Sequence, residues 1–67
     1  MAIHKVIEVL SQSDKGWEDA AQAAVRDAAK TVKMIKSIYI KNMEGVVKDG
    51  KIVQYRVNAN LTFEVGD

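Results

Sequence analysis

The feature that most constrains the fold of this chain is a strict alternation of apolar and polar residues over residues 51–65, KIVQYRVNANLTFEV. Apolar side chains occupy every odd position from Val53 to Val65, and polar side chains occupy the even positions except at Ile52. Because successive side chains of a β-strand point to opposite faces, the pattern predicts one long strand with an apolar and a polar face. Typical strands have roughly 5 or 6 residues, so this one is expected to be the spine of a sheet and to reach past its own subunit.

A second strand is predicted at residues 3–10, IHKVIEVL, which are rich in β-branched residues and end at the polar stretch SQSDKG. Its alternation is imperfect: Ile7 and Val9 share a face with Lys5, whereas Val6 and Leu10 fall on the other. Both faces are therefore partly apolar. In an oligomer, one face would lie on a helix and the other partly on a neighbouring copy.

The segment from Trp17 to about Lys36 is predicted to be a helix. Glu18 and Asp19 place negative charge in its first turn, where it complements the helix dipole. The residues before it that suit a loop or a helix cap are Ser11, Ser13 and Asp14. The expected buried stripe follows helical spacing and consists of Ala20, Ala21, Ala24, Val25, Ala28, Val32 and Ile35. So many alanines would let the helix lie close to the sheet.

Residues 37–47, SIYIKNMEGVV, predict a further strand, with Gly45 as a candidate bulge or bend. Asp49-Gly50 is a two-residue hairpin signal, since both central residues of the favoured turn have positive φ. The predicted order is β-α-β-β. We therefore expect an α+β fold, a three-stranded antiparallel sheet curled around one helix, in a single domain spanning residues 1–67.

Size and composition favour self-association. Domains below about 70–80 residues usually need disulfides, a metal or oligomerisation for stability; this chain has 67 residues, no cysteine and one histidine, His4. Its formal charge of +1 lacks the basic footprint of a nucleic-acid-binding protein. We find no signal-peptide pattern and no apolar run near the ~20 residues of a membrane span. The expectation is a soluble, cytoplasmic protein that binds neither nucleic acid nor membranes.

No arrangement typical of catalysis is found, so we expect no enzyme. Serines occur at positions 11, 13 and 37, but the one histidine lies in the first strand, and a triad is recognised by geometry. The four glycines are too scattered for a phosphate-binding loop. Glu18 and Asp19 are interpreted as negative charges at the helix N-terminus. The alternative is that they bind a metal ion together with symmetry-related copies across an axis of the assembly. Trp17 is interpreted as a packing residue, with a stacking platform for a flat ligand as the alternative.

The polar face of the long strand carries Gln54, Arg56, Asn58 and Asn60. Such a row suits a solvated sheet face, but it also suits a face that meets a ligand or a polar interface. Lysine and glutamate are the commoner choice for a face that meets only water.

In combination, three segments resemble the dodecin family: KVIEV, SDKGWEDAAQAAVRDAAKTV and DGKIVQYRVNANLTFEV, which together cover nearly the whole chain. The resemblance implies a small β-α-β-β subunit that assembles into a hollow homododecamer of tetrahedral symmetry. It also implies a non-enzymatic protein that stores or quenches riboflavin, FMN or related compounds.

In flavin-binding members, a tryptophan just after the helix stacks on the ring and a glutamine after the last-strand tyrosine contacts its polar edge. Ser37 and Arg56 stand at these two positions here. Loss of stacking weakens recognition of a flat ring by about 1–3 kcal/mol per ring, and a guanidinium favours carboxylate or phosphate groups. The expected ligand-binding residues are Ser37, Tyr39, Gln54 and Arg56. Tyr39 is a candidate substitute for the absent ring.

Three alternatives follow from these departures. The first is a flavin-storing shell that binds FMN or riboflavin, with the FMN phosphate meeting Arg56 or lysines. The second is a flavin-independent shell that binds divalent cations or another small anion. Some dodecin-like proteins that lack the tryptophan are associated with divalent cations. The third is a purely structural assembly whose only partner is itself.

Overall fold

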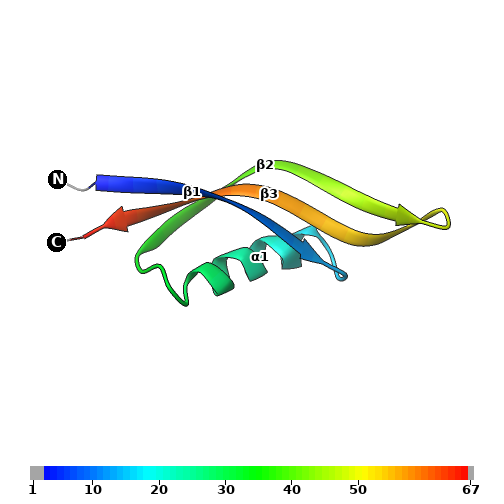
Figure 1. Ribbon diagram of the computed structural model, residues 1–67, viewed down its shortest axis with the longest axis horizontal. Helices are drawn as coiled ribbons and strands as arrows, with labels where there is room; N and C mark the ends of the chain where they lie inside the picture. The colour runs from blue at the N-terminus through cyan, green and yellow to red at the C-terminus, as the bar shows by residue number, and fades with distance from the viewer. Residues whose placement is uncertain (1–2, 67) are drawn as a thin grey trace.

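The computed structural model describes residues 3–66, which form three strands and one helix. In chain order these are β1 (Ile3–Ser13), α1 (Trp17–Ala28), β2 (Ile35–Lys48) and β3 (Lys51–Val65). Both β1 and β2 pair antiparallel with β3, giving the sheet order β1-β3-β2. The helix covers one face of this twisted sheet (Figure 1). The predicted β-α-β-β topology is therefore confirmed.

The central strand β3 has the bounds that the alternation predicted. Its residues Val57, Ala59 and Leu61 are 0–1% exposed and face α1. We call this side of the sheet the helix face and the opposite side the outer face. Since the even-numbered residues of β3 point the other way, the polar row from Gln54 to Asn60 lies on the outer face.

The core is small because the helix contributes mainly alanines. Within residues 3–66, the buried apolar residues are Ala20, Ala24, Val57, Ala59 and Leu61. Small side chains on α1 let the helix backbone approach the sheet, as the sequence predicted. Val9, Trp17 and Ile38 pack around this centre. The covered region is therefore limited to the middle of the sheet.

The β2–β3 hairpin extends past the helix (Figure 1) and closes at Asp49-Gly50, whose φ angles are 54° and 76°. These positive values confirm the predicted turn. A register shift lies between Val46 and Val47 and leaves Val53 without a partner on β2. It brings Ile52 opposite Val47, which accounts for the break in the alternation at Ile52.

The bulge predicted at Gly45 lies instead just after Val46, because Gly45 itself pairs regularly with Tyr55. A Cβ atom at Gly45 would lie 3.3 Å from Cγ2 of Ile52. The glycine therefore makes room for a side chain of the neighbouring strand.

The helix ends earlier than predicted, at Ala28 rather than near Lys36. Beyond it, the backbone N–H groups of Lys30 and Thr31 donate to carbonyls three residues back, so the last turn tightens. Met34 then adopts a left-handed φ of 65°, and its carbonyl accepts a 2.9 Å hydrogen bond from the N–H of Glu64. The chain turns here because β2 must begin beside the end of β3, so Val32 and Ile35 belong to the connection and the strand.

The helix begins at Trp17, as predicted, but its capping residue differs from the prediction. The residue that caps α1 is Gly16, and no side chain caps the helix. Ser13 instead belongs to β1, which runs three residues further than predicted, and its hydroxyl donates a 2.7 Å hydrogen bond to the Asp19 carboxylate. In the described part of the chain, α1 is the one helix, and it is too short and too polar to cross a membrane.

Candidate functional site

The four predicted ligand-binding residues share the outer face but form two separate pairs. Ser37 and Tyr39 on β2 pair with Thr62 and Asn60 of β3. Near the other end, Gln54 and Arg56 lie on β3 itself. Six residues of strand separate Arg56 from the position opposite Ser37, about 20 Å at 3.3 Å per residue. One chain therefore does not bring the two pairs together.

Arg56 is the centre of a polar bridge that crosses all three strands. Its Nε donates a 2.7 Å hydrogen bond to the side-chain oxygen of Gln12 on β1. One of its terminal nitrogens lies 3.7 Å from a carboxylate oxygen of Glu44 on β2. The guanidinium charge is thus partly neutralised within the chain, and a ligand anion at Arg56 would compete with Glu44.

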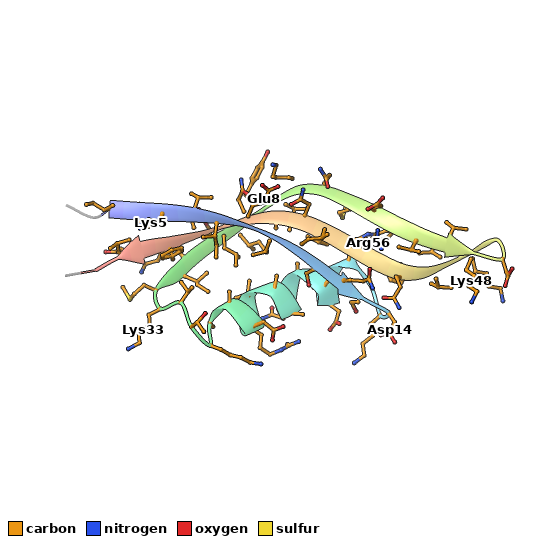
Figure 2. The ribbon with its side chains drawn as sticks, in the orientation of Figure 1. Lys5, Glu8, Asp14, Lys33, Lys48 and Arg56 are labelled. Atoms are coloured by element: carbon orange, nitrogen blue, oxygen red, sulfur yellow. The ribbon has the colours of Figure 1, made fainter. Side chains whose placement is uncertain are left out.

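A second polar cluster, unnoticed in the sequence, lies on the outer face near the middle of the sheet. Lys41 Nζ donates a 3.1 Å hydrogen bond to Glu8 Oε2 across β3. This hydrogen bond, a further one with Asn58 and the lysine charge hold the pKa of Glu8 below its ordinary value. Figure 2 shows Glu8 on the side of the sheet away from α1. Only the strand register brings these residues together, since Glu8 and Lys41 are 33 positions apart.

Tyr39, which lies beside this cluster, is 67% exposed. Its partner across the ladder, Asn60, in turn pairs with Glu8. An exposed aromatic ring next to an amide and an ion pair can stack on a flat ligand and hydrogen-bond to its edge. Of the residues predicted from the sequence, Tyr39 has the surroundings best suited to this role.

Trp17 packs against other residues of its own subunit, as expected for the packing role preferred in the sequence analysis. The indole Nε1 donates a 3.1 Å hydrogen bond to the Glu44 carbonyl oxygen. The ring meets Tyr55 edge to face, with centroids 4.8 Å apart and planes at 83°. These contacts fasten the start of α1 to the β2–β3 hairpin, so this ring is committed to the fold.

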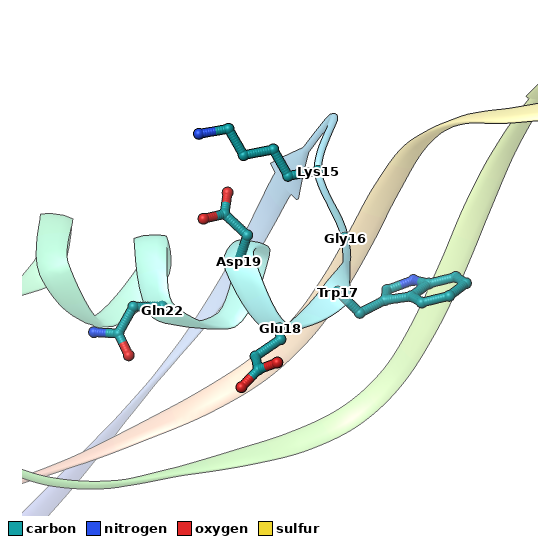
Figure 3. Close-up of a pocket in the computed structure, with 6 residues that line it drawn as sticks. All are labelled: Lys15, Gly16, Trp17, Glu18, Asp19 and Gln22. Atoms are coloured by element: carbon teal, nitrogen blue, oxygen red, sulfur yellow. The ribbon is translucent and has the colours of Figure 1, made fainter.

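A hollow of about 490 Å³ opens beside the start of α1. It is lined by Lys15, Gly16, Trp17, Glu18, Asp19 and Gln22. Figure 3 shows Trp17 turned toward the strands, away from the side of Lys15 and Asp19. The Asp19 carboxylate is already held by Ser13. Throughout residues 3–66, no three histidine, aspartate or glutamate side chains gather closely enough to hold a metal ion.

Comparison with known proteins decides the family. The family model described as Dodecin matches residues 3–66. The chain belongs to the dodecin family. A dodecin from Thermus thermophilus is 27% identical over 63 residues, covering 94% of this chain and 91% of that protein. A protein from Mycobacterium tuberculosis named calcium dodecin is 28% identical over 65 residues, covering 97% of this chain and 92% of that protein.

Solved dodecin structures have the same fold. A crystal structure of a T. thermophilus dodecin mutant superposes with a TM-score of 0.94 at 25% identity and covers 100% of both chains. The crystal structure of the M. tuberculosis calcium dodecin, described as calcium chelating and as having a novel calcium-binding site, gives a TM-score of 0.82 at 26% identity. It covers 96% of this dodecin and 91% of that chain. The long β3 and the helix-covered sheet are therefore features shared with these relatives.

Proposed function

We propose that this dodecin forms a homododecameric shell that binds and stores a small ligand, without enzymatic activity. The observation that carries this proposal is the separation of Ser37 and Tyr39 from Gln54 and Arg56 on one outer face. A ligand site built from all four residues requires at least two copies. The relationship to the dodecins supports the same conclusion.

The leading ligand is a flavin, with Tyr39 in the stacking role. At 67% exposure, its ring is available to a planar ligand. Ser37 leaves space where the resemblance places a tryptophan, and Arg56 offers donors to the phosphate of FMN. Because Glu44 already faces Arg56, FMN has to displace that carboxylate, and we expect weaker binding than with an aromatic residue at position 37.

The direct test is a fluorescence titration of riboflavin and FMN with the purified, assembled protein. Ser37→Trp should raise flavin affinity by about tenfold or more, because ring stacking contributes ~1–3 kcal/mol. Asn42→Trp is the matched control, since Asn42 lies on the outer face of the same strand but outside the predicted site. Equal affinities for the unmodified protein and Ser37→Trp would remove Ser37 from the flavin site.

The second candidate ligand is a divalent cation, which the name of the M. tuberculosis relative favours. Since no three suitable side chains gather within residues 3–66, a cation site would combine carboxylates from several copies. Calorimetric titration of chelator-treated protein with Ca²⁺ tests this candidate. Saturable heat that persists in 0.15 M salt supports it, while heat that salt abolishes contradicts it, because salt screens diffuse surface attraction.

A further inference from the structure

One row of side chains crosses the outer face at the middle of the sheet. Tyr39 on β2 lies opposite Asn60 on β3, and Asn60 lies opposite Glu8 on β1. We call these three residues the cross-strand row. Two spacings between neighbouring strands separate its ends, a distance of about 10 Å. An exposed aromatic ring thus stands at one end of the row, and hydrogen-bonding groups occupy the rest.

The middle of the cross-strand row has hydrogen-bonding capacity that the chain leaves unused. Asn60 is half-buried, and its amide takes part in none of the side-chain hydrogen bonds formed within residues 3–66. A primary amide both donates and accepts. By contrast, Glu8 is already held by Lys41 at 3.1 Å, so the row ends at an ion pair with little net charge. These groups therefore suit a neutral ligand whose own groups donate and accept, as hydroxyls do.

Apolar side chains border the row on β1. Val6 and Leu10 lie two residues to either side of Glu8, so they point to the same outer face. Their exposed fractions are 57% and 70%. A chain laid along the row from β2 to β1 would place C–H groups against these two side chains and hydroxyls against the amide and the ion pair. A polyhydroxyl chain carries both kinds of group.

We infer that the cross-strand row binds the polyhydroxyl chain of a ring-bearing ligand, which in a flavin is the ribityl chain. Tyr39 stacks on the ring, Asn60 exchanges hydrogen bonds with the hydroxyls, and Glu8 meets the far end of the chain. Charge complementarity favours this neutral occupant over an anion, because Glu8 already neutralises Lys41. The inference rests on the proposed flavin ligand and assigns the residues that recognise its chain.

Titrations with riboflavin and lumiflavin separate the chain from the ring, since lumiflavin has the same ring with a methyl group in place of the ribityl chain. Fluorescence quenching by the assembled, unmodified protein should show tighter binding of riboflavin. Asn60→Leu should lower the riboflavin affinity by about fivefold, as expected for one neutral hydrogen bond, and leave the lumiflavin affinity unchanged. Tyr39→Leu should lower both affinities by a similar factor, because both ligands have the ring.

Asn42→Leu is the matched control, because Asn42 is an exposed asparagine on the same face that pairs with Asn58, outside the row. It should leave both affinities unchanged. Light scattering establishes that each variant is assembled, and Asn60→Val, with a strand-favouring residue, gives the same comparison if the leucine variant does not assemble.

Three results would overturn the inference and leave the flavin function standing. The first is equal affinity of the unmodified protein for riboflavin and lumiflavin. The second is an assembled Asn60→Leu protein that keeps its riboflavin affinity, and the third is one that loses affinity for both ligands alike. An assembled, unmodified protein that binds neither ligand overturns both the inference and the flavin function.

Discussion

The covered middle of the sheet and the β2–β3 hairpin use the same alternation but differ in burial. In the middle, Val57 and Leu61 are 0–1% exposed beneath α1. Past the helix, Val47 and Ile52 are 65% and 47% exposed. The difference is the helix, which is only 12 residues long. The molecule is 51 Å long, so the helix covers only part of the sheet. A pattern of alternation therefore specifies a strand, but the covering element decides which of its residues form a core.

The largest effect is expected from placing a charge in each region. Val57→Asp should abolish folding, because an unpaired buried carboxylate costs several kcal/mol and a core of this size supplies only ~3–5 kcal/mol. Val47→Asp should leave the far-UV circular dichroism spectrum unchanged, since Val47 is 65% exposed. Phe63→Asp, at the partly buried end of the same apolar face, should also prevent folding and assembly. A folded, soluble Val57→Asp monomer would contradict our account of β3.

A smaller effect is expected at the turn through which the chain leaves α1. Met34 has a positive φ and a half-exposed side chain, so Met34→Gly relieves backbone strain and removes little buried surface. We expect the free energy of unfolding to rise by about 0.5–1 kcal/mol. Asp49→Gly is the control in the hairpin turn and should give a smaller gain, because aspartate tolerates this conformation. Chemical denaturation measures the free energy of unfolding of both variants. A Met34→Gly protein that is less stable than the unmodified protein would show that the backbone at Met34 is not strained.

The smallest effect is expected on the outer face, at Glu8. Because the Lys41 hydrogen bond lowers the pKa of Glu8 in the folded protein, the folded state favours the ionised carboxylate. That contribution is present above the ordinary pKa of glutamate and is lost as the pH falls through the lowered folded value. The pair is exposed, so the loss of stability in acid should be slight and weakened by salt.

Comparing thermal unfolding of the unmodified protein and Glu8→Gln between neutral and acidic pH measures the Glu8 contribution. The variant should lose less stability on acidification than the unmodified protein. Identical pH profiles would show that the ion pair contributes nothing in solution.

Much of the fold follows from local patterns that the sequence displays directly. The period of two in β3, the turn residues Asp49-Gly50 and the acids at the start of α1 act within a few residues. Each is a local preference of backbone and side chain, and each was predicted from the sequence. The resemblance to the dodecins was also visible in the sequence, and the family match over residues 3–66 confirmed it.

The site was predicted less completely, because its residues meet across strands. Glu8 and Lys41, or Gln12 and Arg56, come into contact only when β1 and β2 take their register on β3. Likewise, the sequence gives no sign that Ser37 and Arg56 lie about 20 Å apart along the strand direction. Register is a long-range property, set by how the whole apolar face fits beneath the helix.

The sequence by itself determined the number, type and order of the elements, the hairpin turn and the family. The tertiary structure alone decided where α1 ends, how far β1 runs and which polar residues share the outer face. Helix and strand ends depend on competing partners: residues 29–34 follow a helical pattern, but the chain leaves the helix because β2 must begin beside the end of β3. Local propensity favours an element, and packing against the rest of the chain fixes its limits.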